Sequence, residues 1–122
     1  MDTQAYQNAK QALAAEDYKA AEREFRLALD SIGEDDRLHN NVQSYYGLCQ
    51  VMNSKQNGLL LCRDAASNEM SDGDVFLNLA CAEWESDNRK RAIDAIQQGL
   101  KIDADHIQLN RACARLDCRN RR

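Results

Sequence analysis

Two histidines and five cysteines are the side chains of this 122-residue chain best suited to nucleophilic or metal chemistry. A cysteine nucleophile paired with a histidine base would have to use His39 or His106. Both are expected at turns or helix starts, where a histidine caps the helix or contacts solvent. The sequence also lacks a glycine-rich phosphate loop, the pattern His-Glu-x-x-His and any Cys-x-x-Cys pair. We therefore expect a protein that is not an enzyme.

A zinc site could use His106, Cys113 and Cys118 as ligands. The two cysteines are five residues apart, which on one continuous helix separates them by about 140° around the axis. Ligands that share a helix face are three or four residues apart. The spacing therefore argues against a zinc site.

The segment DGDVFLNLACAE at 72–83 resembles a calcium-binding loop in having acidic residues at its first, third and last positions. Phe76 and Leu77 occupy the places where such a loop needs an oxygen ligand and a glycine for its sharp turn. We expect no calcium site here, and no metal or cofactor elsewhere in the chain.

Arg111, Arg115 and Arg119 recur at every fourth residue and form a basic stripe on an expected last helix. Residues 1–110 carry 11 basic and 19 acidic side chains, a balance of −8, whereas residues 111–122 have a balance of +4. The acidic body argues against nucleic acid as a partner. A basic stripe near a helix C-terminus is commonly solvated, and its alternative role is contact with an acidic partner or RNA.

The cysteine content favours a cytoplasmic protein with reduced, mostly buried thiols, because the count is odd and no secretion signal is recognisable. The longest apolar run, GLLLC at 58–62, is too short to cross a bilayer, so no membrane association is expected. A length of 122 residues is typical of a single domain.

Helical periodicity runs along the whole chain and is interrupted by short polar turns. The absence of proline and the abundance of Ala, Leu, Gln, Glu and Arg also favour helix. We predict an all-α fold, with helices over 3–15, 17–31, 36–53, 57–69, 73–86, 89–102 and 105–118.

A small–large–small pattern recurs in every second helix, with small residues four before and three after a larger one. The three sets are Ala21, Phe25 and Ala28; Gly58, Cys62 and Ala65; and Ala92, Ile96 and Gly99. The helix before each set has a small residue near its middle, namely Ala9, Gly47 and Ala80. Small residues let two helices approach closely, and the larger one fills the space beside the contact. The pattern therefore predicts three helical hairpins.

A helix–turn–helix unit of about 34 residues with this pattern resembles the tetratricopeptide repeat (TPR). The best match is VFLNLACAEWESDNRKRAIDAIQQGLKIDADH at 75–106, and the first unit matches in EDYKAAEREFRLAL at 16–29. The resemblance implies a single domain, a right-handed superhelix of three hairpins over about 2–35, 40–70 and 73–105. Residues 105–118 would then form a capping helix, packed through its apolar side chains Ile107, Leu109, Ala112, Cys113 and Leu116.

In this family the first helix of each hairpin lines a concave groove, which receives an extended peptide or a partner helix. The resemblance places ten side chains there: Tyr6, Lys10, Asn41, Tyr45, Leu48, Met52, Asp74, Leu77, Asn78 and Cys81. Members that grip the carboxylate ends of chaperone tails use a cluster of Lys, Arg and Asn. Only Lys10 and Asn78 would serve here and Asp74 would repel a carboxylate, so that ligand is not expected.

Trp84 follows Phe76 and Ala80 at spacings of four and is expected in the core, with a groove-facing position as the alternative. The sequence as a whole predicts a non-enzymatic protein–protein interaction module, with homo-oligomerisation left open. The alternatives are a secretion-type chaperone for one protein substrate, because TPR chaperones are also small and acidic, and an RNA-associated or regulatory protein that uses the arginine helix.

Overall fold

The computed structural model describes residues 1–118, and within that range the protein is all-helical with no strand. The predicted all-α fold is confirmed. The helices are α1 (Thr3–Ala14), α2 (Tyr18–Asp30), α3 (His39–Met52), α4 (Asn57–Ser67), α5 (Gly73–Glu85), α6 (Arg89–Ile102) and α7 (Ile107–Leu116). The largest departure from the predicted bounds is at α3, which starts three residues later because Asp36 turns the chain by accepting a hydrogen bond from the Leu38 N–H.

The turns inside the three hairpins share one backbone conformation. Glu16, Ser54 and Asp87 each have a positive φ, between 59° and 66°. The N–H of the next residue then bonds back to a carbonyl in the last turn of the preceding helix: Asp17 to Ala12, Lys55 to Gln50 and Asn88 to Glu83. This pattern is the Schellman ending of a helix, which satisfies carbonyls that would otherwise lack partners. The same ending closes the first helix of every hairpin.

Small residues make the closest helix contacts, as the sequence pattern predicts. A Cβ atom built on Gly47 in α3 would lie 2.6 Å from the carbonyl oxygen of Gly58 in α4. Ala9 and Ala21 have no exposed surface at the corresponding place between α1 and α2. Phe25, also fully buried, fills the space beside that contact and stacks on Tyr45 with ring centroids 5.1 Å apart.

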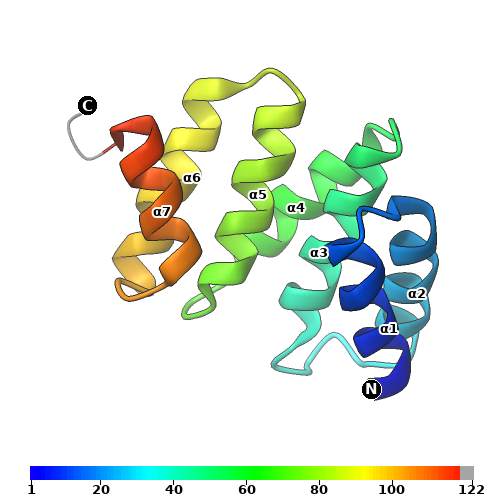
Figure 1. Cartoon of the computed structure of the whole chain (residues 1–122). Coiled ribbons are helices and arrows are strands. Elements are labelled where there is room, and N and C mark those ends of the chain that lie inside the picture. The colour runs from blue at the N-terminus through cyan, green and yellow to red at the C-terminus, as the bar shows by residue number, and fades with distance from the viewer. Residues whose placement is uncertain (119–122) are drawn as a thin grey trace.

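The hairpins follow one another in chain order, so that α1 and α2 lie at one end of the molecule and α6 and α7 at the other (Figure 1). Ion pairs join neighbouring hairpins. Lys55, in the α3–α4 turn, is 2.6 Å from Glu22 in α2. Arg63 in α4 donates two hydrogen bonds of 2.9 Å to the carboxylate of Glu83 in α5.

The last helix, α7, packs against α6 and α5. Leu109 and Cys113 are buried in this contact, and Ala112 and Leu116 are partly buried. The expectation that Ile107 shares this apolar side is wrong, because 66% of its surface is exposed. Ile107 precedes Leu109 by two residues, about 200° around the helix axis, so it lies on the exposed side of α7 with Arg111.

Cys113 and Cys118 form a disulfide, so the prediction of five reduced cysteines is wrong. The spacing rule holds only if both cysteines lie on one continuous helix. Instead, α7 ends at Leu116, and Asp117 adopts a left-handed φ of 53°. The chain therefore turns back, which brings the Cα atoms of the two cysteines to 5.0 Å. Gln97 in α6 holds the turn by donating a hydrogen bond of 2.6 Å to the carbonyl of Cys118.

Candidate binding groove

A groove of about 680 Å³ runs along α1, α3, α5 and α7. Ala92 and Ile96 of α6 also contribute to its wall. Of the ten side chains placed in a groove by sequence, seven line it: Lys10, Tyr45, Leu48, Met52, Leu77, Asn78 and Cys81.

The other three predicted residues, Tyr6, Asn41 and Asp74, do not line the groove. The hydroxyl of Tyr6 donates a 2.7 Å hydrogen bond to Asn41, whose amide in turn donates to Asp72. The resemblance assigned these residues to the groove by position in the repeat, and it carries no information on which polar side chains pair with one another across the helices.

A chain of polar contacts crosses from α1 to α7. The ammonium of Lys10 lies 2.8 Å from the hydroxyl of Tyr45, which is 3.3 Å from Asp74. Asp74 is 2.6 Å from Nε2 of His106, the residue before α7. Burial, reinforced by the nearby negative charge of Asp74, raises the pKa of Tyr45 above its usual value. The phenol therefore stays protonated, accepts from Lys10 and donates to Asp74.

Trp84 is half-buried and lines the groove, so the expectation that it belongs to the core is wrong. Phe76 and Ala80, eight and four residues earlier, are buried. A step of four residues exceeds one helical turn by about 40°. Two steps therefore rotate Trp84 well away from the direction of Phe76, toward the open side of α5.

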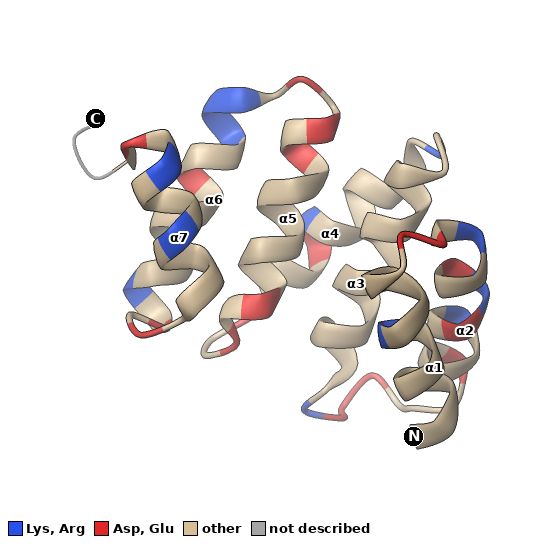
Figure 2. Cartoon of the chain, viewed as in Figure 1, with Lys and Arg blue, Asp and Glu red and all other residues tan. Residues whose placement is uncertain are grey.

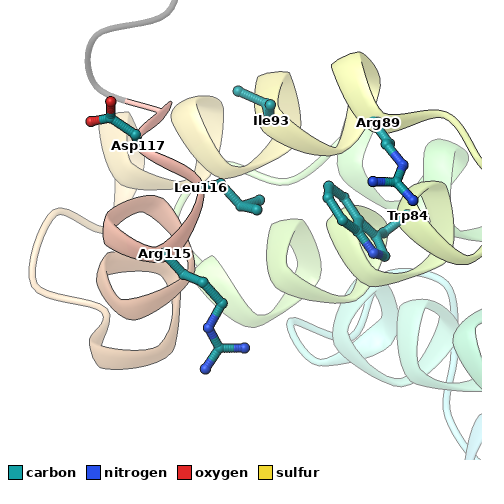
Figure 3. A pocket seen from close by; sticks show the side chains of 6 residues that line it. All are labelled: Trp84, Arg89, Ile93, Arg115, Leu116 and Asp117. Atoms are coloured by element: carbon teal, nitrogen blue, oxygen red, sulfur yellow. The ribbon is translucent and has the colours of Figure 1, made fainter.

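A side pocket of about 340 Å³ adjoins the groove where α5 ends, α6 begins and α7 ends. Figure 3 shows its lining side chains, which are Trp84, Arg89, Ile93, Arg115, Leu116 and Asp117. The guanidinium carbon of Arg89 lies 4.5 Å from the centroid of the Trp84 ring. Trp84, Arg115 and Leu116 line both the groove and the pocket, so the two spaces lie next to each other.

Positive side chains gather at this end of the molecule, at the start of α6 and along α7 (Figure 2). Arg111 and Arg115 of the predicted basic stripe are exposed on α7, and Arg119 lies outside the described residues. Of the two arginines that the structure describes, Arg115 lines the groove and the side pocket, and Arg111 lines neither.

Two of the three free thiols are poorly suited to nucleophilic chemistry. Cys49 and Cys62 are fully buried, and burial raises the pKa of Cys49 to about 12 and that of Cys62 further. Cys81 is exposed in the groove. His106 is held between Asp74 and the N–H of Leu109.

Within residues 1–118, no group of three or more His, Cys, Asp or Glu side chains is arranged to hold a metal ion. Over the same residues, every helix is too short or too polar to span a bilayer. Comparisons with family models, curated proteins and solved structures find no match to this chain.

Proposed function

We propose that this protein is a non-enzymatic protein–protein interaction module, which binds an extended peptide or a helix of a protein partner in the groove. The observation that carries the proposal is the combination of partly exposed apolar and aromatic side chains with a polar group in one groove. Leu77, Cys81 and Trp84 offer anchoring surface, and Lys10 offers a hydrogen-bond donor. Interfaces of this kind derive most of their affinity from a few buried aromatic and aliphatic contacts.

We also propose that the three hairpins are tetratricopeptide-type repeats stacked in a right-handed superhelix, with α7 as the cap. Two observations support this arrangement: the shared Schellman endings and the small residues at the hairpin contacts. The high pKa of the buried thiols supports a role without catalysis. A cytoplasmic location remains part of the proposal, although disulfides are rare in that compartment.

A peptide selection with the purified protein tests the proposed function. Random peptides displayed on phage are selected against the native chain and retested on two variants. Cys81→Arg places a long charged side chain in the groove at an exposed position. Leu60→Arg makes the same kind of change on α4 at a residue that is 61% exposed and does not line the groove.

The proposal requires that selected peptides lose binding to Cys81→Arg and keep it with Leu60→Arg. Peptides that bind both variants as tightly as the native chain would show that the groove is not the binding surface. A selection that yields no binder above background would count against the function itself.

A further inference from the structure

The side pocket carries an inference about the partner's chemistry, and this inference rests on the proposed function. We propose that the pocket binds an acidic side chain of the partner segment, while a neighbouring aliphatic side chain of that segment packs on Trp84. Arg115 would donate hydrogen bonds to the carboxylate, and the positive charge of Arg89 at the same pocket would add to the attraction.

The guanidinium of Arg89 lies over the Trp84 ring. Stacking of a guanidinium on an indole orients its plane and leaves N–H donors at its edge available. Its ion-pair partner is Asp87, at 3.6 Å, and the two side chains are 66% and 91% exposed. An ion pair so exposed contributes little, so Arg89 remains available to a better-positioned carboxylate.

Arg115 lines the same pocket from α7. Among residues 1–118 it makes no ion pair or hydrogen bond, and its side chain is exposed. Arginines from two different helices therefore line one pocket, and in Figure 3 the Arg115 guanidinium points away from that of Arg89. A carboxylate suits such a lining, because a single arginine can donate two parallel hydrogen bonds to it.

The pocket is also partly apolar, through Ile93, Leu116 and the exposed part of the Trp84 ring. A ligand that carries only charge would leave these surfaces uncovered. A carboxylate next to an aliphatic side chain would cover both kinds of surface at once.

The surrounding charge favours a peptide over a nucleic acid. Glu85 lines the adjoining groove and Asp117 lines the pocket itself, and residues 1–110 have a balance of −8. A chain of phosphates would meet these negative groups on either side of the two arginines. A single carboxylate on an apolar segment would avoid most of this repulsion.

A peptide titration followed by NMR tests the inference. Trp84 is the only tryptophan, so its indole N–H gives one assignable signal at the pocket. The probes are two blocked dipeptides, N-acetyl-Leu-Glu-amide and N-acetyl-Leu-Gln-amide, which differ in charge but hardly in shape. We expect the Glu peptide to shift the Trp84 signal with a Kd roughly tenfold lower than the Gln peptide, the typical effect of one charged hydrogen bond.

Two variants test which arginine recognises the carboxylate of the Glu peptide. Arg115→Gln should abolish the difference between the two peptides. Arg111→Gln, on the same helix and also exposed but outside the pocket lining, should preserve it. Equal affinities of the two peptides for the native protein would overturn the inference, as would an equal effect of the two variants.

A third probe, a dodecamer of uridine, tests the nucleic-acid alternative. The inference fails if two results are found together. The dodecamer would shift the Trp84 signal at lower concentration than the Glu peptide, and both arginine variants would lower its affinity equally, which would show that the site binds phosphate. Peptides that shift groove residues such as Leu77 without preferring Glu would overturn this inference alone and leave the proposed function standing.

Discussion

Nε2 of His106 lies 2.6 Å from Oδ1 of Asp74, while Nδ1 of the same ring accepts a 3.1 Å hydrogen bond from the N–H of Leu109. An accepting Nδ1 carries no proton, so the ring's hydrogen is on Nε2 and is donated to Asp74. One imidazole thereby caps α7 and joins it to α5. Through Asp74 and Tyr45 the same set of contacts reaches Lys10 in α1.

Replacing His106 should therefore weaken the attachment of α7. We expect His106→Ala to lower the free energy of unfolding by about 1–2 kcal/mol, because it removes both the cap and the bond to Asp74. Ile107→Ala is the matched control, since that neighbouring side chain is exposed and should change stability by less than about 0.5 kcal/mol. Urea unfolding measures both, and equal losses in the two variants would show that the His106 contacts contribute nothing.

Because Cys113 and Cys118 are joined, the purified protein should contain three free thiols. After unfolding without reductant, a thiol-reactive dye should label Cys49, Cys62 and Cys81 and no other cysteine. Cys118→Ser should lower the free energy of unfolding by about 2 kcal/mol under oxidising conditions, which is the loop-entropy value for so short a loop. Five labelled thiols in protein purified without reductant would contradict the disulfide.

Stability should fall in acid because of Glu83. Burial alone would raise the pKa of its carboxyl, but hydrogen bonds from Arg63 and Asn88 outweigh burial and hold that pKa below the usual 4.5. A carboxyl with a lowered folded-state pKa stabilises the fold above its unfolded-state pKa, and this contribution is lost as pH falls through the folded-state value. Urea midpoints should therefore drop from neutral pH to below about pH 4.5.

The variant Glu83→Gln tests whether this residue carries that effect. At neutral pH it should cost about 2–3 kcal/mol, because Arg63 loses a bidentate partner that is almost wholly buried. Its stability should also depend less on pH in the acid range than that of the native chain. Asp30→Asn removes the exposed pair of Asp30 with Arg26 and should change little. Parallel acid profiles of Glu83→Gln and the native chain would assign the pH dependence to other carboxyls.

The glycine contact between α3 and α4 should be intolerant of a single methyl group. Ala is favoured over Gly in a helix by about 1 kcal/mol, yet Gly47→Ala should destabilise by about 1–3 kcal/mol because its Cβ would press on the Gly58 carbonyl. Gly33→Ala, where no atom lies within 4 Å of the added Cβ, is the control and should be neutral. Thermal unfolding compares the two, and a stabilised Gly47→Ala would mean that the helices can separate without cost.

The sequence by itself determined the helices and the places where they approach most closely. Both depend on local information: a period of 3.6 residues, polar turns, and small residues that recur at matching positions such as Ala21 and Ala92. The groove residues were expected from the resemblance to a helical repeat, and seven of those ten side chains line the groove.

Only the tertiary structure decided how side chains from different hairpins pair. Tyr6, Asn41 and Asp74 form polar contacts across the groove-forming helices because stacking brings residues some 30 positions apart within hydrogen-bond distance. No local pattern encodes that register. The disulfide could not be predicted from residue spacing either. Two cysteines five residues apart point to different sides of a continuous helix, but the left-handed backbone of Asp117 ends the helix between them and lets Cys113 and Cys118 bond.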